Sequence, residues 1–442
     1  MNETQNRKIM KRLIVILFAS SLTVYTSSAK SRDFETRTAT VQVEVSPNDL
    51  INIEAKNTDL MVEAWDKNQV EIVATLRFDG KMTDKMTAFL ENFQKHVEEN
   101  IRKSGNELII ETNLDEPNKV QIGSKHVGII IGFSEDEFRL DYKIKAPKAN
   151  RFEIDHSYKD VSLIGDFRKM NLKQYSGDLT ADFIQEAELN LKYGNAIIKG
   201  LGVVDMELYE QELEIETVEE LEINTKYSEI EIDEIGTMKA VSYETDFVFG
   251  TIKSASGNYK YGEMEVKNRI GESDFEFYEM DLTANSAGSI EFTSSKYGKH
   301  EFGTISSLVM DQSYEDELTI DELGNFKSKD SKYGNHAIEL LSGAFDLNAY
   351  EDDLEIEEVS SSVDRIAIAG KYINASFGIS DQSYNLKTNV KYGTVDYDES
   401  AVEVKRYIKE GDKLEVEVLS KTASSNPIQV IVEGYEIDVE IN

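Results

Sequence analysis

A tyrosine recurs about every 18 residues through most of the chain, and no other feature of the sequence limits the possible folds as strongly. Neighbouring members of this series are 16 to 22 residues apart. Self-similarity at a short, fixed period is typical of repeat proteins, in which each unit buries its apolar face against the next unit. The fourteen members are Tyr158, Tyr175, Tyr193, Tyr209, Tyr227, Tyr243, Tyr261, Tyr278, Tyr297, Tyr314, Tyr333, Tyr350, Tyr372 and Tyr392.

The residues next to these tyrosines alternate between two motifs. One motif is Lys-Tyr, usually followed by glycine, as in Lys192-Tyr193-Gly194. The other motif is Tyr-Glu, as in Tyr209-Glu210. The duplicated unit is therefore about 35 residues long and consists of two similar coils.

Apolar residues alternate with polar ones on both sides of each tyrosine, as Leu221 and Ile223 do before Tyr227 and Ile230 and Ile232 do after it. A period of two indicates strands. Helical repeats need more residues than one coil has, and a propeller blade needs about 40 or more residues. We therefore predict an all-β fold, namely a parallel β-solenoid (a single-stranded β-helix) with coils of about 18 residues over residues 151–400. Equivalent strands would stack at roughly 4.8 Å.

The direction of the tyrosine side chains is left open by the pattern. In the Lys-Tyr coils the tyrosine is in step with the apolar residues before it, as Leu191 and Tyr193 are, whereas Tyr209 directly follows Leu208. Either the chain turns a corner there or alternate tyrosines face outward. We favour an inward-facing structural ladder, because stacked aromatic pairs contribute about 0.5–1.5 kcal/mol each. An outward stripe would instead be a platform that binds carbohydrate or a protein partner.

The two flanks of the repeats differ from them in pattern. Residues 30–150 read as a β-rich region with one amphipathic helix over residues 84–103, which begins after Thr83 and ends before Gly105. Residues 401–442 alternate again and predict an antiparallel β cap. Because the ends of a solenoid expose unpaired strand edges, we expect both flanks to act as caps.

The first 29 residues have the form of a secretory signal peptide. A basic stretch precedes the apolar segment 13–24, and small residues end at Ala29 before the expected cleavage site. An uncleaved anchor is the alternative. The chain has no cysteine, so it has neither disulfides nor the cysteine that a lipoprotein anchor needs. We expect an exported protein of the periplasm, cell surface or exterior that is not a lipoprotein and has no transmembrane segment after cleavage.

The charge balance limits the possible partners. Lys and Arg number 48, and Asp and Glu number 84, which gives a net charge of −36. Nucleic acids require a basic surface, so we expect no nucleic-acid partner. The expected partner is a protein or glycan of the cell envelope, and we expect no cofactor.

Residue types that carry catalysis or bind metals are sparse. The five histidines include no pair at metal-ligand spacing, and we interpret the equivalent His300 and His336, two coils apart, as structural. The acidic clusters 351–353 and 396–399 read as solvated turns, with weak calcium binding as the alternative. No nucleophile elbow or phosphate-binding glycine loop is present. We therefore assign no catalytic, cofactor-binding or metal-binding residue.

The N-terminal region contains a predicted strand, a turn, a strand ending in Trp-Asp and a Val-x-Val strand. The strands are the stretches Ile51-Asn52-Ile53-Glu54-Ala55, Leu60-Met61-Val62-Glu63-Ala64-Trp65-Asp66 and Val70-Glu71-Ile72-Val73. In this they resemble the opening of the family called DUF4097, the β-strand-repeat putative adhesins, and the likeness covers most of residues 38–400. It implies a β-solenoid and an exported bacterial protein. Many family members have glycine where this chain has tyrosine, and no functional residue carries over.

Together these observations predict a non-catalytic, exported bacterial β-solenoid that acts as an adhesin-like or scaffold protein of the cell envelope. One alternative is a periplasmic module that binds a basic protein in envelope sensing. The other is a carbohydrate-active β-helix enzyme that uses acidic residues and calcium.

Overall fold

A computed structural model describes residues 35–112, 120–124, 127–131, 138–379, 382–422, 424 and 426–442. Strands account for 78% of the residues and helices for 4%, which confirms the prediction of an all-β fold. The predicted signal peptide (residues 1–29) and His126 lie outside the described residues. In the described part of the chain, no helix is both long enough and apolar enough to cross a membrane.

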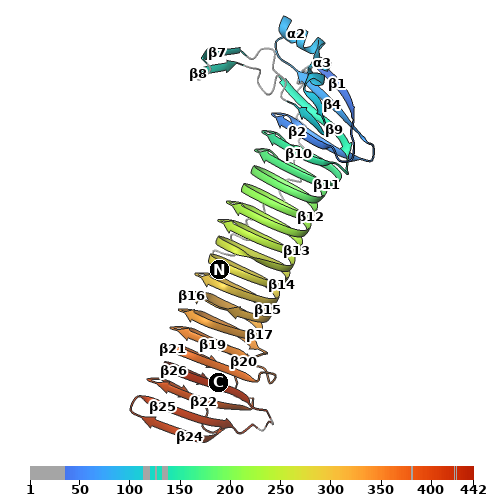
Figure 1. The fold of residues 1–442 in the computed structure, drawn as a ribbon. Helices are drawn as coiled ribbons and strands as arrows, with labels where there is room; N and C mark the ends of the chain where they lie inside the picture. The colour runs from blue at the N-terminus through green and yellow to red at the C-terminus, as the bar shows by residue number, and fades with distance from the viewer. Residues whose placement is uncertain are drawn as a thin grey trace, which may run out of the picture.

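The middle of the molecule is a long stack of parallel strands (Figure 1). Most segments pair with a segment 17 or 18 residues further along, as in the register Ile215 with Ile232 and Ile232 with Phe249, and the offset grows to 21 residues where Phe345 pairs with Ile366. We call one such circuit of the chain a rung. The strands of the stack are β10 (Arg151–Ser157), β11 (Val161–Tyr175), β12 (Leu179–Lys226), β13 (Glu229–Tyr243), β14 (Asp246–Lys296), β15 (Lys299–Met310), β16 (Ser313–Tyr314), β17 (Glu317–Lys332), β18 (Asn335–Leu341), β19 (Phe345–Tyr350), β20 (Asp353–Val359) and β21 (Arg365–Phe377).

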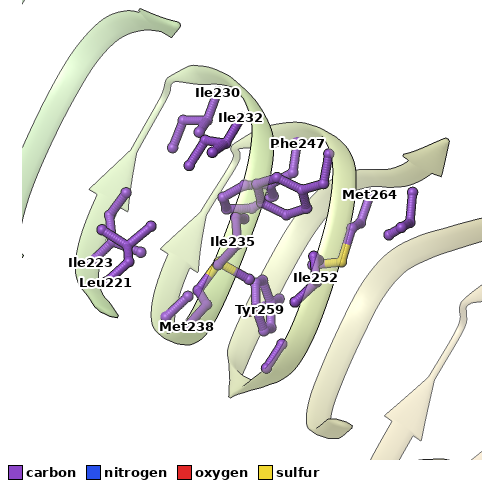
Figure 2. Packing of buried hydrophobic residues seen from close by; sticks show 14 of the residues in the cluster. Leu221, Ile223, Ile230, Ile232, Ile235, Met238, Phe247, Ile252, Tyr259 and Met264 are labelled. Atoms are coloured by element: carbon purple, nitrogen blue, oxygen red, sulfur yellow. The ribbon is translucent and has the colours of Figure 1, made fainter. Parts of the chain in front are cut away.

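The core runs through the inside of the stack. Alternate residues of each rung point inward, so that Ile230, Ile232 and Phe247 are at most 2% exposed (Figure 2). Equivalent residues of successive rungs lie above one another and form continuous apolar columns. Because every rung covers the apolar side chains of its neighbours, the stack buries a core along its whole length.

The first rung of the stack comes from the N-terminal region, outside the range 151–400 that the tyrosine pattern marks. Strands β2 (Leu50–Lys56) and β3 (Asp59–Trp65) pair in parallel with β10 and β11. Their other edges pair with β6 (Glu107–Glu111) and β9 (Phe138–Pro147). The remaining strands of this end are β1 (Glu35–Glu44), β4 (Gln69–Phe78), β5 (Ile101–Ser104) and the separate hairpin of β7 (Val120–Ser124) and β8 (Val127–Ile131).

Two short helices stand where the sequence predicts one helix over residues 84–103. These are α2 (Asp84–Glu91) and α3 (Phe93–Glu99), and residues 101–104 belong to strand β5. Helix α2 begins as expected, because the Thr83 hydroxyl accepts a hydrogen bond of 3.2 Å from the Met86 amide. The break lies at Asn92, whose side-chain amide donates to the Ala88 carbonyl at 2.7 Å. Such local side-chain bonds compete with helix continuation.

The C-terminal end corrects the prediction of an antiparallel cap over residues 401–442. Strands β24 (Val402–Glu410) and β25 (Lys413–Ser420) are antiparallel to their partners, and β25 pairs with β22 (Tyr384–Lys391). Strand β26 (Ile428–Ile441), in contrast, runs parallel between β21 and β22 and is a further rung of the stack. Strand β23 (Thr394–Asp396) also pairs with β26 in parallel. The alternation of apolar residues reports a strand but not its direction.

Candidate functional site

All fourteen predicted tyrosines form one continuous column along an edge of the stack. Successive rings contact one another with centroids 5.2–5.7 Å apart and planes inclined by 63–82°, which is edge-to-face geometry. The column has one further member that was not predicted, Tyr435 of β26, which lies between Tyr372 and Tyr392. Its motif, Tyr435-Glu436, is a Tyr-Glu motif and was the available signal. We call these fifteen residues the tyrosine stripe.

The tyrosine stripe faces outward, so the favoured inward orientation is wrong. Tyr158 is 47% exposed, Tyr227 is 43% exposed and Tyr372 is 38% exposed, and none of the fifteen residues is buried. The inner positions beside the stripe belong to other residues, among them the fully buried Tyr259, which is not part of the series. The alternation of apolar residues before each tyrosine does not continue through it, because the chain turns at that point.

The turn is a corner at which one residue per rung has a positive φ angle. In the Lys-Tyr motif this residue is the tyrosine, as at Tyr227 with φ 56°. In the Tyr-Glu motif it is the glutamate, as at Glu244 with φ 47°. Consistently, the strand register aligns Lys226 with Tyr243. The two motifs therefore place the ring either on the corner or one residue before it, and both placements bring the ring into the same column.

The left-handed conformation is unfavourable for tyrosine and glutamate. It costs roughly 1–2 kcal/mol for a residue with a Cβ atom, and glycine or asparagine is the usual occupant. In the first rung the corner residue is indeed Asn57, with φ 54°. Backbone bonds between rungs hold the other corners, such as the Glu244 amide to the Lys260 carbonyl at 2.9 Å. Repeated strain of this kind is retained where the neighbouring structure enforces it, and it is a reason to look for function.

Charges of both signs lie within the stripe. Seven corner tyrosines follow a lysine, and six corners are glutamates. The glutamates act on the phenols beside them: partial desolvation and the charge of Glu244 raise the pKa of Tyr243. A hydrogen bond to the Glu315 carboxylate raises the pKa of Tyr314. The phenols of Tyr243 and Tyr314 therefore stay neutral and keep a proton to donate at physiological pH.

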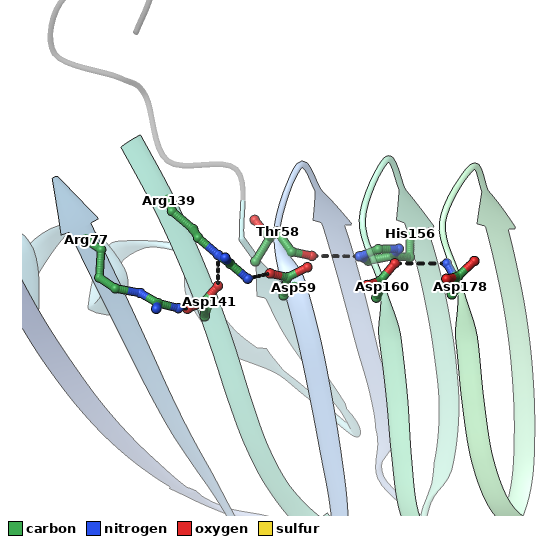
Figure 3. A network of polar contacts seen from close by, with 8 residues as sticks. All are labelled: Thr58, Asp59, Arg77, Arg139, Asp141, His156, Asp160 and Asp178. Carbon is green, nitrogen blue, oxygen red and sulfur yellow. Dashed lines mark hydrogen bonds and ion pairs between the residues drawn. The ribbon is translucent and has the colours of Figure 1, made fainter. Parts of the chain in front are cut away.

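A column of mostly acidic, exposed residues runs beside the stripe, two positions after each corner. Part of its role is structural, because the Asp160 carboxylate accepts a bond of 3.0 Å from the Asp178 amide of the next rung (Figure 3). The Asp246 carboxylate accepts in the same way from the Glu263 amide at 3.0 Å. We call this set the acidic column; its members are Asp160, Asp178, Glu212, Glu229, Asp246, Glu263, Asp281, Glu317, Asp353 and Asp438.

The first rungs carry a further polar network on the same edge (Figure 3). Arg139 forms ion pairs with Asp59 and Asp141, and His156 Nε2 lies 2.8 Å from the Thr58 carbonyl oxygen. His156 is 1% exposed, and its burial lowers the pKa of the imidazole. These contacts join the N-terminal strands to the stack, and the neutral His156 serves as an internal hydrogen-bonding group.

The two equivalent histidines lie in one inner column, with Leu318 between them. His300 stacks on Phe292 with centroids 4.6 Å apart, and complete burial lowers its pKa to about 3. His336 Nε2 lies 3.0 Å from the buried Asp352 carboxylate. The two imidazoles therefore have separate partners and share no metal position.

Ser295, His300 and Asp316 are the residue types of a hydrolytic triad, but they are not arranged as one. Ser295 Oγ lies 2.9 Å from His300 Nε2. Asp316, however, bonds to Ser313 Oγ at 2.7 Å and to the Gly298 amide at 3.0 Å, whereas His300 Nδ1 has no partner. A triad requires the carboxylate at Nδ1 and an accessible hydroxyl, and all three side chains are at most 1% exposed.

The acidic clusters considered for calcium do not form a site. Asp352 is buried against His336 and the Gly334 amide, and Asp353 bonds to Asn374. Asp398 bonds to Ser400 within its own turn. Among the residues that the structure describes, no three histidine or acidic side chains are placed to hold one metal ion.

No protein-family model matches the sequence, and no curated protein matches it. The resemblance to DUF4097 therefore stays a prediction. Among solved structures, the chain is similar to a putative cell adhesion protein from Clostridium sporogenes, with 10% identity, a TM-score of 0.17, and coverage of 92% of this chain and 100% of that chain. A putative adhesin from Parabacteroides merdae shows 13% identity and a TM-score of 0.20 over 66% of this chain and 96% of that chain.

A third solved structure is described as a putative lipid binding protein from Parabacteroides distasonis. It shows 11% identity and a TM-score of 0.18 over 91% of this chain and 96% of that chain. These values describe a remote likeness, so the candidate site is defined by its own geometry, which is an outward, strained tyrosine stripe beside an acidic column.

Proposed function

We propose that the chain is an exported β-solenoid that works as a non-catalytic, adhesin-like or scaffold protein of the cell envelope, with the tyrosine stripe as its contact surface. The observation that carries this proposal is the repetition of exposed tyrosines on strained corners. Exposed, contiguous aromatic surface is typical of interaction sites. Tyrosine suits such a surface because it offers a large rigid ring and a polar hydroxyl at a low entropic cost.

The length of the stripe supports a scaffold or adhesin role. Fourteen ring contacts at roughly 4.8 Å of rise per rung give a surface about 67 Å long. A surface of this form fits an extended partner or many copies of a small one, and it does not fit the enclosed pocket that a small substrate needs.

The cellular part of the proposal is tested by protease shaving of intact cells, followed by blotting for this protein with a periplasmic marker as control. Loss of the band while the marker persists supports exposure at the surface, as an adhesin requires. Protection until the envelope is breached contradicts the adhesin form and leaves a scaffold or a partner-binding module of the periplasm.

The contact surface is tested with a variant that keeps the corner conformation. Asparagine occupies the first corner, so Tyr227→Asn, Tyr297→Asn and Tyr333→Asn together remove three exposed rings without requiring a new backbone. The matched control replaces Ile197, Val203 and Val404, which are 54%, 50% and 49% exposed outside the stripe, by serine. We expect labelled protein to bind isolated envelopes, the control to bind equally and the asparagine variant to lose binding. Equal binding by all three proteins contradicts the proposal.

A further inference from the structure

The tyrosine stripe is close to electrically neutral, although the chain as a whole carries −36. Its lysines (Lys192, Lys226, Lys260, Lys296, Lys332, Lys371 and Lys391) nearly balance its corner glutamates (Glu210, Glu244, Glu279, Glu315, Glu351 and Glu436). A surface that selects a charged partner concentrates one sign of charge. The stripe does the opposite within a very acidic molecule, which points to an uncharged ligand.

The stripe has a period of two rungs. The motifs alternate, so the exposed corner tyrosines Tyr193, Tyr227, Tyr297 and Tyr333 are separated by one or more rungs whose corner is glutamate. Two rungs correspond to roughly 9.6 Å along the stack. A ligand that contacts several of these rings at once must therefore be an extended polymer with a regular repeat.

Hydrogen-bonding groups accompany the rings on both sides. The acidic column provides exposed carboxylates on one side. On the other side Asn190 and Asn258, which lie on the same strand face as the lysines, bond to carboxylates of the next rung, in the second case at 2.7 Å. Carboxylates accept strong bonds from hydroxyl groups but repel polyanions. Aromatic rings pack against the apolar C–H faces of sugars, and carboxylates and amides bond to sugar hydroxyls. The edge of the stack therefore offers both kinds of group that a sugar chain requires.

We propose that the tyrosine stripe binds an extended, uncharged polysaccharide, whose sugar rings lie over the exposed tyrosines and whose hydroxyls bond to the acidic column. This inference rests on the proposed function, because it names the class of partner that the same stripe takes. A basic protein segment would be attracted to the acidic column as well, and the charged comparisons in the experiment below distinguish it from an uncharged sugar chain.

The test uses the full mature chain in native affinity electrophoresis and calorimetry with a panel of uncharged polysaccharides, including hydroxyethyl cellulose, mannan, laminarin and dextran. Polygalacturonate and poly-L-lysine are the charged comparisons. We expect at least one uncharged polymer to bind, with an affinity that changes little between 0.05 and about 0.5 M salt, since no ions are released. The triple asparagine variant should bind about 10-fold more weakly or not at all, and the serine control should bind normally.

Binding to poly-L-lysine alone, lost at high salt, overturns the inference in favour of a cationic partner. Binding to none of the uncharged polymers also overturns it. The envelope assay separates this failure from that of the proposed function: periodate, which cleaves sugar diols, should abolish binding to envelopes, and protease should not. Stripe-dependent binding that survives periodate and is lost with protease contradicts the polysaccharide but keeps the contact surface.

Discussion

The interior columns and the tyrosine stripe are both built from one residue per rung, but they differ in what they contribute to the fold. Interior residues such as Ile232 and Phe249 are 0% exposed, and full burial of a side chain of this size contributes about 1.5–3 kcal/mol. Stripe residues stay largely exposed and occupy or adjoin strained corners. Their edge-to-face contacts contribute about 0.5–1.5 kcal/mol per pair, which roughly offsets a left-handed residue at about 1–2 kcal/mol.

Regular repetition by itself therefore does not identify a structural role. The interior columns explain the stability of the stack, whereas the net free-energy contribution of the stripe to folding is close to zero. A column that adds little stability and yet recurs in every rung from Tyr158 to Tyr392 is the basis for the proposed contact with a partner. An interior that stabilises and a surface that binds should respond differently to substitution.

The largest effect is expected in the interior. Phe249→Ala removes a fully buried ring that lies 5.4 Å from Phe247 and leaves a cavity. We expect a loss of about 3–5 kcal/mol in the free energy of unfolding, measured by urea denaturation monitored by circular dichroism. Val241→Ala, at a 52% exposed position, is the control and should change stability by less than about 0.5 kcal/mol. Similar losses of stability for the two variants would contradict the stabilising role of the interior columns.

A second interior effect depends on pH. Burial lowers the pKa of His300 to about 3, whereas the unfolded chain has a histidine pKa of 6.5. Stability is therefore complete above pH 6.5 and falls as the pH drops toward 3, because only the unfolded chain takes up the proton. At pH 5 this histidine should cost about 2 kcal/mol relative to pH 7.

The control for this effect is His300→Leu, because the register places Leu282 and Leu318 directly above and below His300. Urea denaturation of both proteins at pH 7 and pH 5 isolates the histidine from the many carboxylates of the chain. The variant should lose less stability than the native chain between the two pH values. An equal loss in both proteins would show that His300 is not the group responsible.

Much of the interior was predictable, because the period of apolar residues depends on local sequence alone. The alternation at Ile230 and Ile232 identified strands, and the tyrosine spacing gave the 17- or 18-residue register that pairs Ile215 with Ile232. The direction of a strand is not local information. The C-terminal strand β26 therefore could not be recognised as a parallel rung inserted between β21 and β22.

The orientation of the stripe was missed for a similar reason. An outward ring at Tyr227 requires a positive φ angle, and a tyrosine is not a residue from which this conformation is expected. Asn57, which tolerates it, occupies the same corner in the first rung, but its equivalence to Tyr158 emerges only from the pairing of β2 with β10. Strand pairing over about 100 residues is a property of the folded chain and not of a sequence window.

A smaller effect, of opposite sign, is expected at the corners. Glu244→Gly relieves a residue with φ 47° and leaves every ring of the stripe in place, so it should stabilise the chain by about 1 kcal/mol. Tyr261→Gly relieves the equivalent strain, at φ 61°, but removes ring contacts with Tyr243 and Tyr278 and should bring no gain. Urea denaturation of the two variants distinguishes strain from ring contacts. A stabilised Tyr261→Gly chain would mean that the ring contacts contribute nothing.

The smallest effect is expected on the outer surface away from the stripe. Lys239 and Glu222 form an ion pair of 3.0 Å between neighbouring rungs, and both side chains are more than 60% exposed. Exposed pairs of this kind contribute about 0–1 kcal/mol, so Lys239→Gln should leave the free energy of unfolding within about 0.5 kcal/mol of the native value. The same variant should bind envelopes normally, because it alters charge without altering the stripe. If it weakened binding as much as the triple asparagine variant does, the contact surface would have to extend over the face of the stack, and the distinction between stripe and surface would fail.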